Sequence, residues 1–229
     1  MYSTYAVGMP SAPDRGPRRL RADAATNRDR VVAAARTVFA RDGVAAPLTA
    51  VAHEAGVGIA TLYRRFPDRE ELVAAAFGDA LREYDASALE ALAALDPWDG
   101  FAGLVTRMGE IEARNRGFTH IIQSQSLPVR RRAAEVDPGY LAVVEVVRRA
   151  HDGGVLRPEV TADDLPVISF AVAGILETTR DDLPDAWRRH VALVLDGCRA
   201  GAGPPLPPAP DPRALQRAMI RSTRRRQSR

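Results

Sequence analysis

The sequence contains no lysine, a single cysteine and few aromatic residues. Because Cys198 stands alone, an intramolecular disulfide is excluded, and no group of Cys and His has the spacing of metal ligands. Aromatic residues make up 6% of the chain, and its apolar residues are mostly Ala, Val and Leu, which favour helices packed on helices. We therefore expect an all-α protein with no metal and no cofactor.

Long apolar runs are also missing. No stretch reaches the roughly 18 consecutive apolar residues of a membrane span. The N-terminus lacks the basic-then-apolar order of a signal peptide. The 229 residues are 46% hydrophobic, which is enough for a packed core. We expect a cytoplasmic protein with no membrane partner.

Charge is unevenly distributed along the chain. Residues 1–77 carry 11 Arg against 8 acidic residues, residues 78–200 carry 14 against 20, and residues 201–229 carry 7 against 1. A basic first third on an acidic body indicates that the N-terminal part approaches a polyanion. The exclusive use of Arg is explained equally well by genome base composition, so it is given no functional meaning.

Helical periodicity begins near Thr26, after a basic arm over residues 1–25 that we expect to be flexible. Thr26 or Asn27 is the predicted N-cap of this first helix, and Gly43 marks its end. Two short helices follow, over "PLTAVAHEA" with Pro47 at its first position and over "IATLYRRF". Asp68 is then the predicted N-cap of a longer helix.

Proline and glycine divide the rest of the chain. Apolar-periodic stretches between them predict helices near residues 97–115, 118–126, 138–152, 161–181 and 185–200. Residues 201–229 are a Pro-rich linker, a short helix at "PRALQRAMI" and a basic tail, which we expect to be disordered.

The two short helices, separated by "GVG", have the form of a helix-turn-helix. Leu62 and Phe66 lie four residues apart and are predicted to pack inward. The remaining arc has small residues first, then an aromatic residue and two arginines: Ile59, Ala60, Thr61, Tyr63, Arg64 and Arg65. Small residues permit close approach to base edges, while tyrosine and arginine bind phosphate or guanine. This pattern predicts DNA binding.

Catalytic motifs fail on single residues. His53-Glu54 begins a zinc-protease motif, but Val57 occupies the position of the second histidine. Thr61 stands where a dinucleotide fingerprint needs its third glycine. We expect no enzyme. Two alternatives remain: a small-molecule-binding or enzymatic helical protein with a vestigial helix-turn-helix, and a nucleic-acid-coating protein that binds through its Arg-rich tail.

Residues 30–77 resemble the DNA-binding domain of the TetR family of bacterial transcriptional regulators. The family run A-G-V-G-x-x-T-L-Y-x-x-F-x-x-[KR]-x-x-L is matched at every fixed position from Ala55 to Leu72. The resemblance implies a three-helix DNA-binding domain over residues 26–77 and a long fourth helix. It also implies a ligand-binding and dimerisation domain over residues 78–200, and a homodimer that represses from a pseudo-palindromic operator until a small-molecule effector binds.

The resemblance also implies which residues meet DNA. They are Thr49, Gly58, Ile59, Ala60, Thr61, Tyr63, Arg64, Arg65 and Arg69. Pro47 replaces a Ser or Thr that caps the second helix and touches phosphate in many members, so that contact is absent. Ile59 and Ala60 offer thymine a methyl contact but cannot hydrogen-bond a base. The arginines of the arm, Arg18, Arg19 and Arg21, either reach a minor groove or the flanking DNA backbone, or solubilise the chain.

The stretches "DPWDGFAGLVTRM" and "LPDAWRRHVALVLDGCRAG" are similar to the SbtR-like C-terminal class of this family. By this resemblance the effector pocket lies among the middle helices. Its candidate lining, for which ordinary core is the alternative, is Phe101, Leu104, Met108, Ile111, Phe118, His120, Ile122, Gln123 and Val144. The candidate dimer interface is Ile168, Ile175, Trp187, Val191 and Val194.

Overall fold

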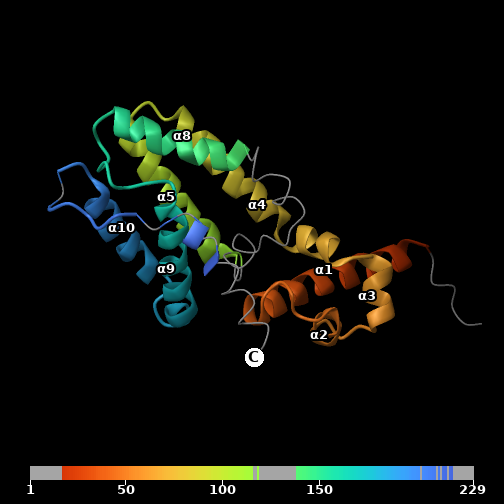
Figure 1. Cartoon of the computed structure of the whole chain (residues 1–229). Helices are drawn as coiled ribbons and strands as arrows, with labels where there is room; N and C mark the ends of the chain where they lie inside the picture. Colours follow the sequence, from red (N-terminus) through yellow and green to blue (C-terminus); the bar gives the residue numbers. More distant parts are fainter. Residues whose placement is uncertain are drawn as a thin grey trace, which may run out of the picture.

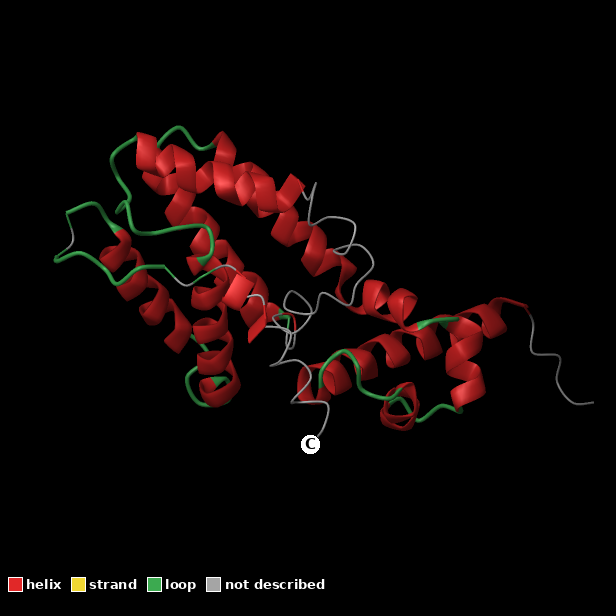
Figure 2. Cartoon of the chain, viewed as in Figure 1, coloured by secondary structure: helices red, strands yellow, loops and turns green. Residues whose placement is uncertain are grey.

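The computed structural model describes residues 17–115, 118, 138–201, 203–209, 211, 213–215, 217 and 218, with side chains for all of these except 17–25 and 138. Within them the chain forms helices and no strand (Figures 1 and 2). The helices are α1 (Pro17–Asp42), α2 (Leu48–Glu54), α3 (Ile59–Arg65), α4 (Arg69–Ala93), α5 (Pro97–Arg114), α8 (Pro138–Asp152), α9 (Asp164–Thr179) and α10 (Ala186–Cys198). The all-α prediction is confirmed.

The helix ends follow local chemistry in some places and depart from the predictions in others. Helix α1 begins at Pro17, so the predicted cap at Thr26 or Asn27 is wrong and residues 17–25 of the predicted arm are helical. Proline fits a first helical position because its missing N–H has no partner there in any helix. Pro47 was expected at the first helical position of α2, but it is the N-cap and the helix begins at Leu48. The Asp68 carboxylate accepts from the Glu71 N–H at 2.8 Å, which confirms the predicted cap of α4.

The N-terminal core lies where α1, α2, α3 and the first half of α4 meet, on the right in Figure 1. Phe39, Leu62 and Phe77 are among its large buried side chains, and most of its smaller members are Ala and Val. Ile111 near the end of α5 and Phe118 are fully buried in the same core. Residues outside the helix-turn-helix unit therefore contribute to its core.

The second core is built by α5, α8, α9, α10 and the second half of α4. Tyr84 on α4 packs against both cores, and α4 runs from one to the other in Figure 1. Arg149 on α8 donates from Nη2 to the Ala94 carbonyl at 3.0 Å and from Nη1 to the Leu92 carbonyl. These bonds satisfy carbonyls at the C-terminus of α4 that have no partner within the helix. None of the described helices is long and apolar enough to span a membrane.

Trp187 on α10 packs directly on the backbone of α5. It is 1% exposed, and a Cβ built on Gly109 of α5 would lie 2.7 Å from its Cε3 atom. Only a glycine permits this approach. Trp187 and Val191, 3% exposed, are thus interior residues of the single chain. The prediction that they lie in the dimer interface is corrected, since a side chain buried at that level has no surface left for a partner.

We predict that Gly109→Ala lowers the free energy of unfolding by about 1–3 kcal/mol, because the indole and α5 must separate to admit the methyl group. Gly103→Ala, on the same helix with open space around its Cβ, is the matched control. It should leave stability unchanged or raise it by up to about 1 kcal/mol. Urea titration followed by circular dichroism measures both variants, and equal stabilities would contradict the packing described here.

Candidate DNA-binding interface

A tight turn separates α2 from α3. Gly56 adopts a φ of +63°, a left-handed conformation that favours glycine, and its N–H donates to the His53 carbonyl at 3.0 Å. The Val57 N–H donates to the Ala52 carbonyl, also at 3.0 Å. These bonds close the end of α2 and redirect the chain into α3. The turn predicted from "GVG" is therefore present.

Helix α3 is fixed to the core by one face. Leu62 is 0% exposed and Phe66 is buried beside it, in the same core as Val51, Ala52 and Ala55. The predicted inward face is confirmed. Gly58 caps the helix with its backbone, and the space around a Cβ built there is open. The N-terminal end of α3 can therefore lie close to another molecule.

The exposed arc of α3 has a crest and two flanks. At 100° per residue, Ala60 and Arg64 lie opposite the buried face and form the crest, and both are exposed. Ile59 and Tyr63 form one flank, with Tyr63 49% exposed. Thr61 and Arg65 form the other flank, and Arg64 Nη2 donates to Thr61 Oγ1 at 3.0 Å. Small apolar groups thus stand beside basic ones on a surface held rigidly from behind.

A cleft that the sequence did not reveal runs between α1 and the second flank. Its volume is about 190 Å³. Its lining residues are Asn27, Arg28, Val31, Thr61, Arg64 and Arg65. Asn27 and Arg28 were not among the predicted contacts, because their nearness to Arg65 arises from the packing of α1 on the small domain. No local pattern carries that information.

Comparisons with known proteins agree with this geometry. The family model described as "Bacterial regulatory proteins, tetR family" matches residues 31–76. The TetR transcriptional regulator SCO0520 from Streptomyces coelicolor is 32% identical, over 76% of this chain and 99% of that one. The chain belongs to the TetR family. It is a DNA-binding transcriptional regulator with a helix-turn-helix.

Solved structures support the TetR-family fold. PfmR from Thermus thermophilus is 22% identical, with 73% of this chain and 97% of that one covered, and a TM-score of 0.55. KstR2 of Mycobacterium tuberculosis is 19% identical, with 75% and 94% covered, and a TM-score of 0.54. For SCO0520 the TM-score is 0.43, so sequence identity rather than superposition carries that comparison. No curated protein matches the chain.

Arg69, a predicted DNA contact of this TetR-family chain, also binds backbone carbonyls within the small domain. Its Nη1 donates to the carbonyls of Val44 and Ala46, both at 2.6 Å, and the side chain is half-buried. Burial lowers the pKa of the guanidinium below its ordinary value. Arg69 therefore ties the loop between α1 and α2 to the start of α4. Its contact with phosphate stays a prediction, as does that of Thr49 on α2, which is exposed.

Two further arginines of the basic N-terminal third are used internally. Arg30 Nη2 donates to the Ala55 carbonyl at the end of α2, at 2.7 Å. Arg36 Nε donates to the Ala76 carbonyl on α4, also at 2.7 Å. Some arginines of residues 1–77 thus bind backbone carbonyls within the fold, whereas others lie on its surface. Residues 17–25 are helical and not flexible as predicted, whereas the contact of the arm with DNA stays a prediction.

The predicted effector lining is mostly core. Five of its members are at most 3% exposed: Phe101, Leu104, Met108, Ile111 and Phe118. Ile111 and Phe118 belong to the N-terminal core, and Val144 lies on the surface. The other three, His120, Ile122 and Gln123, lie outside the described residues.

A small cavity lies beside Met108, between α5 and α9. Its volume is about 10 Å³, room for one water molecule. Its walls are apolar except for Glu112 and Ser169, whose hydroxyl donates to the Glu112 carboxylate. Met108 is thus a predicted lining residue that borders an internal space.

We predict that Arg69→Gln lowers the free energy of unfolding by about 1–3 kcal/mol, because two loop carbonyls lose a charged donor. Arg82→Gln on the same helix is the control, since its exposed pair with Asp79 is worth only about 0–1 kcal/mol. Chemical denaturation measures both. A variant of unchanged stability that has lost DNA affinity would support the phosphate contact that the sequence predicted.

Proposed function

We propose that the protein is a ligand-responsive repressor that binds a pseudo-palindromic operator as a homodimer in the cytoplasm. The observation that carries this proposal is the exposed arc of α3, whose apolar crest residue and basic neighbours project from a helix anchored by Leu62. A rigid helix about 10–12 Å wide fits the major groove, which is about 12 Å wide.

The proposed DNA contacts divide by position on the helix-turn-helix unit. Crest residue Arg64 is the candidate for hydrogen bonds to guanine, and Ala60 beside it permits close approach. Ile59 offers a methyl contact, and Tyr63 a donor to phosphate. The remaining proposed contacts are Thr49, Gly58, Thr61, Arg65 and Arg69.

Dimerisation is proposed through the outer faces of α9 and α10. Ile168, Ile175 and Val194 are half-buried in the single chain. Leu193 on α10 is 61% exposed and Val167 on α9 is 42% exposed, although neither was predicted. Pairing of these faces across a two-fold axis would cover them and present two α3 helices to the two half-sites of an operator.

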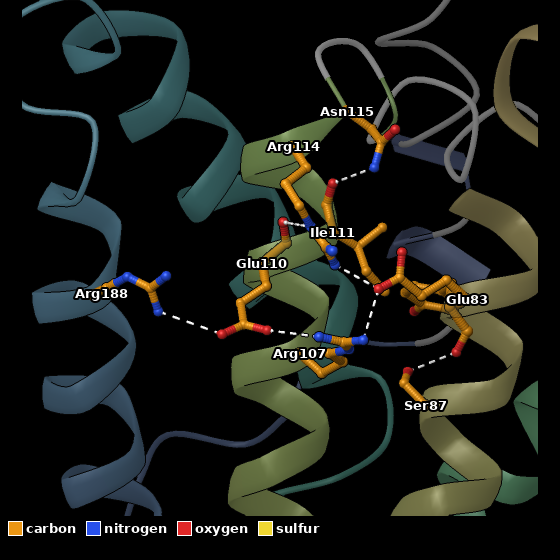
Figure 3. Close-up of polar contacts among 9 residues, drawn as sticks. Glu83, Ser87, Arg107, Glu110, Ile111, Arg114, Asn115 and Arg188 are labelled. Carbon is orange, nitrogen blue, oxygen red and sulfur yellow. Dashed lines mark hydrogen bonds and ion pairs between the residues drawn. The ribbon is translucent and has the colours of Figure 1, made fainter. Parts of the chain in front are cut away.

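A polar network supports communication between that interface and α4 (Figure 3). Glu83 on α4 pairs with two arginines of α5, Arg107 at 2.9 Å and Arg114 at 2.5 Å. Glu110 on α5 pairs with Arg107 at 3.0 Å and with Arg188 on α10 at 3.5 Å. The hydrogen bond from Arg107 lowers the pKa of Glu110. The network therefore links α10, α5 and α4 side by side.

The proposed effector acts by differential binding. It must bind the form that releases DNA more tightly than the form that holds it, since a ligand of equal affinity shifts no equilibrium. The cavity beside Met108 is the proposed starting point of its site, and Glu112 and Ser169 supply polar groups there.

We take the protein to be a regulator rather than an enzyme. In the described residues no group of three His, Cys, Asp or Glu residues is placed to hold a metal.

Substitutions on α3 test the proposed DNA contacts. On a duplex selected in vitro by the wild-type protein, Arg64→Ala should weaken binding by about 10- to 100-fold and reduce discrimination between bases. Tyr63→Phe should weaken it by about 2- to 10-fold through loss of one hydrogen bond. Fluorescence anisotropy measures both, with Arg148→Gln on α8 as a distant control. Unchanged affinity in both variants would remove α3 from the interface.

Truncation after Gly203 addresses the Arg-rich tail. We expect the truncated protein to keep its preference for the selected duplex over a scrambled one, because the residues proposed to read bases lie on α3. Loss of that preference would favour the coating protein instead.

A further inference from the structure

The cleft between α1 and α3 has the composition of an anion site. Arg28, Arg64 and Arg65 line it together with the polar side chains of Asn27 and Thr61, and none of its lining residues is acidic. Arg28 itself has an acidic neighbour on an exposed part of α1, Asp29, whose Oδ1 lies 3.9 Å from its Nη1. Three cations around one opening of about 190 Å³ produce a positive potential that a bound anion would lower.

Arg28 is held over this opening by its neighbours. Its guanidinium carbon lies 5.8 Å above the centre of the Phe66 ring, which is itself buried at the end of α3. Such stacking restricts the flat guanidinium while leaving its edge donors available. On the opposite side, Arg64 bonds to Thr61 across one turn of α3. Two of the arginines that line the cleft, Arg28 and Arg64, are therefore restrained by contacts with neighbouring side chains.

The position of the cleft indicates which anion it meets. A helix lying in the major groove has a sugar-phosphate backbone on each side of it. The crest of α3, with Ala60 and Arg64, faces the base edges, so the two flanks face the two backbones. Tyr63 lies on one flank, whereas Thr61 and Arg65 lie on the flank next to α1. Asn27 and Arg28 on α1 extend that second flank outward.

We propose that this cleft seats a backbone phosphate of the operator, and that Arg28 is a further DNA-binding residue which positions α3 in the major groove. This rests on the proposed function of α3 as the reading helix. A phosphate contact carries no sequence information, so Arg28 fixes the register and angle of α3 while Arg64 reads bases. Arg28 thereby brings α1 into the interface as a second support for the recognition helix.

The test uses the full-length protein with two duplexes of equal length, one selected in vitro and one scrambled. Arg28→Gln should weaken binding to both by about 5- to 10-fold, leaving their ratio unchanged. It should also reduce the slope of log affinity against log salt, between about 50 and 200 mM, by about 0.9 for each bound protomer. Arg28→Lys should keep the slope and recover part of the affinity. Arg82→Gln is the control for loss of an exposed arginine elsewhere.

An unchanged salt slope in Arg28→Gln would overturn the proposal. If Arg64→Ala still weakens selected binding in that case, the proposed function stands and only the cleft assignment fails; if neither variant changes affinity, the proposed function fails as well. Free inorganic phosphate, titrated at constant ionic strength, separates the two sources of this anion. Thermal stabilisation by phosphate that Arg28→Gln abolishes, together with unchanged DNA binding, would assign the cleft to a small anion and overturn its role with DNA.

Discussion

Helix α4 is the constraint on which the structure depends, because one rigid element belongs to two cores. Its 25 residues span about 37 Å at the rise of an α-helix. Leu72 and Phe77 are buried with the helix-turn-helix unit, whereas Ala88 and Ala91 are buried with α5 and α8. Ile111 and Phe118, from the part of the chain after α4, are buried in the core of the helix-turn-helix unit. A rotation of the helix-turn-helix unit relative to the second core therefore requires side chains along α4 to repack. The two parts are not joined by a flexible linker.

Arginine holds the helix ends together in this lysine-free chain. Arg30, Arg149 and Arg180 donate to carbonyls at the C-termini of α2, α4 and α5. Arg157, which is buried, donates to Gly197 at the end of α10. A helix C-terminus combines orphan carbonyls with the negative end of the macrodipole, so a cation with several donors suits it. Much of the positive charge thus stabilises the fold.

Features set by near neighbours in the sequence could be predicted, and features set by long-range packing could not. The inward face of Leu62 and Phe66 follows from their spacing, and the Asp68 cap from its place before an apolar-periodic run. Arg69 fits the family run, yet the carbonyls it binds are presented by a loop more than 20 residues away. The motif alone could not distinguish an arginine that binds phosphate from one that binds its own backbone.

The same limit explains the second half of the chain. Trp187 has the size and chemistry of an interface residue, and only the missing side chain at Gly109 makes it an interior one. The helices predicted near 97–115, 138–152, 161–181 and 185–200 agree with α5, α8, α9 and α10 within three residues at each end, because Pro and Gly mark the boundaries, whereas the one predicted near 118–126 lies outside the described residues. Which apolar face turned inward could not be predicted, since α9 is apolar on more than one side.

The contact between Gly109 and Trp187 also has a geometric consequence for assembly. Because the six-membered ring of the indole lies against Gly109 of α5, it restrains the rotation of α10 about its own axis, and with it the direction in which Leu193 points. The angle between two subunits paired through that face is thus determined from inside each subunit. In the proposed dimer, a group that separated the indole from α5 would alter the distance between the two α3 helices without contacting either the subunit interface or DNA.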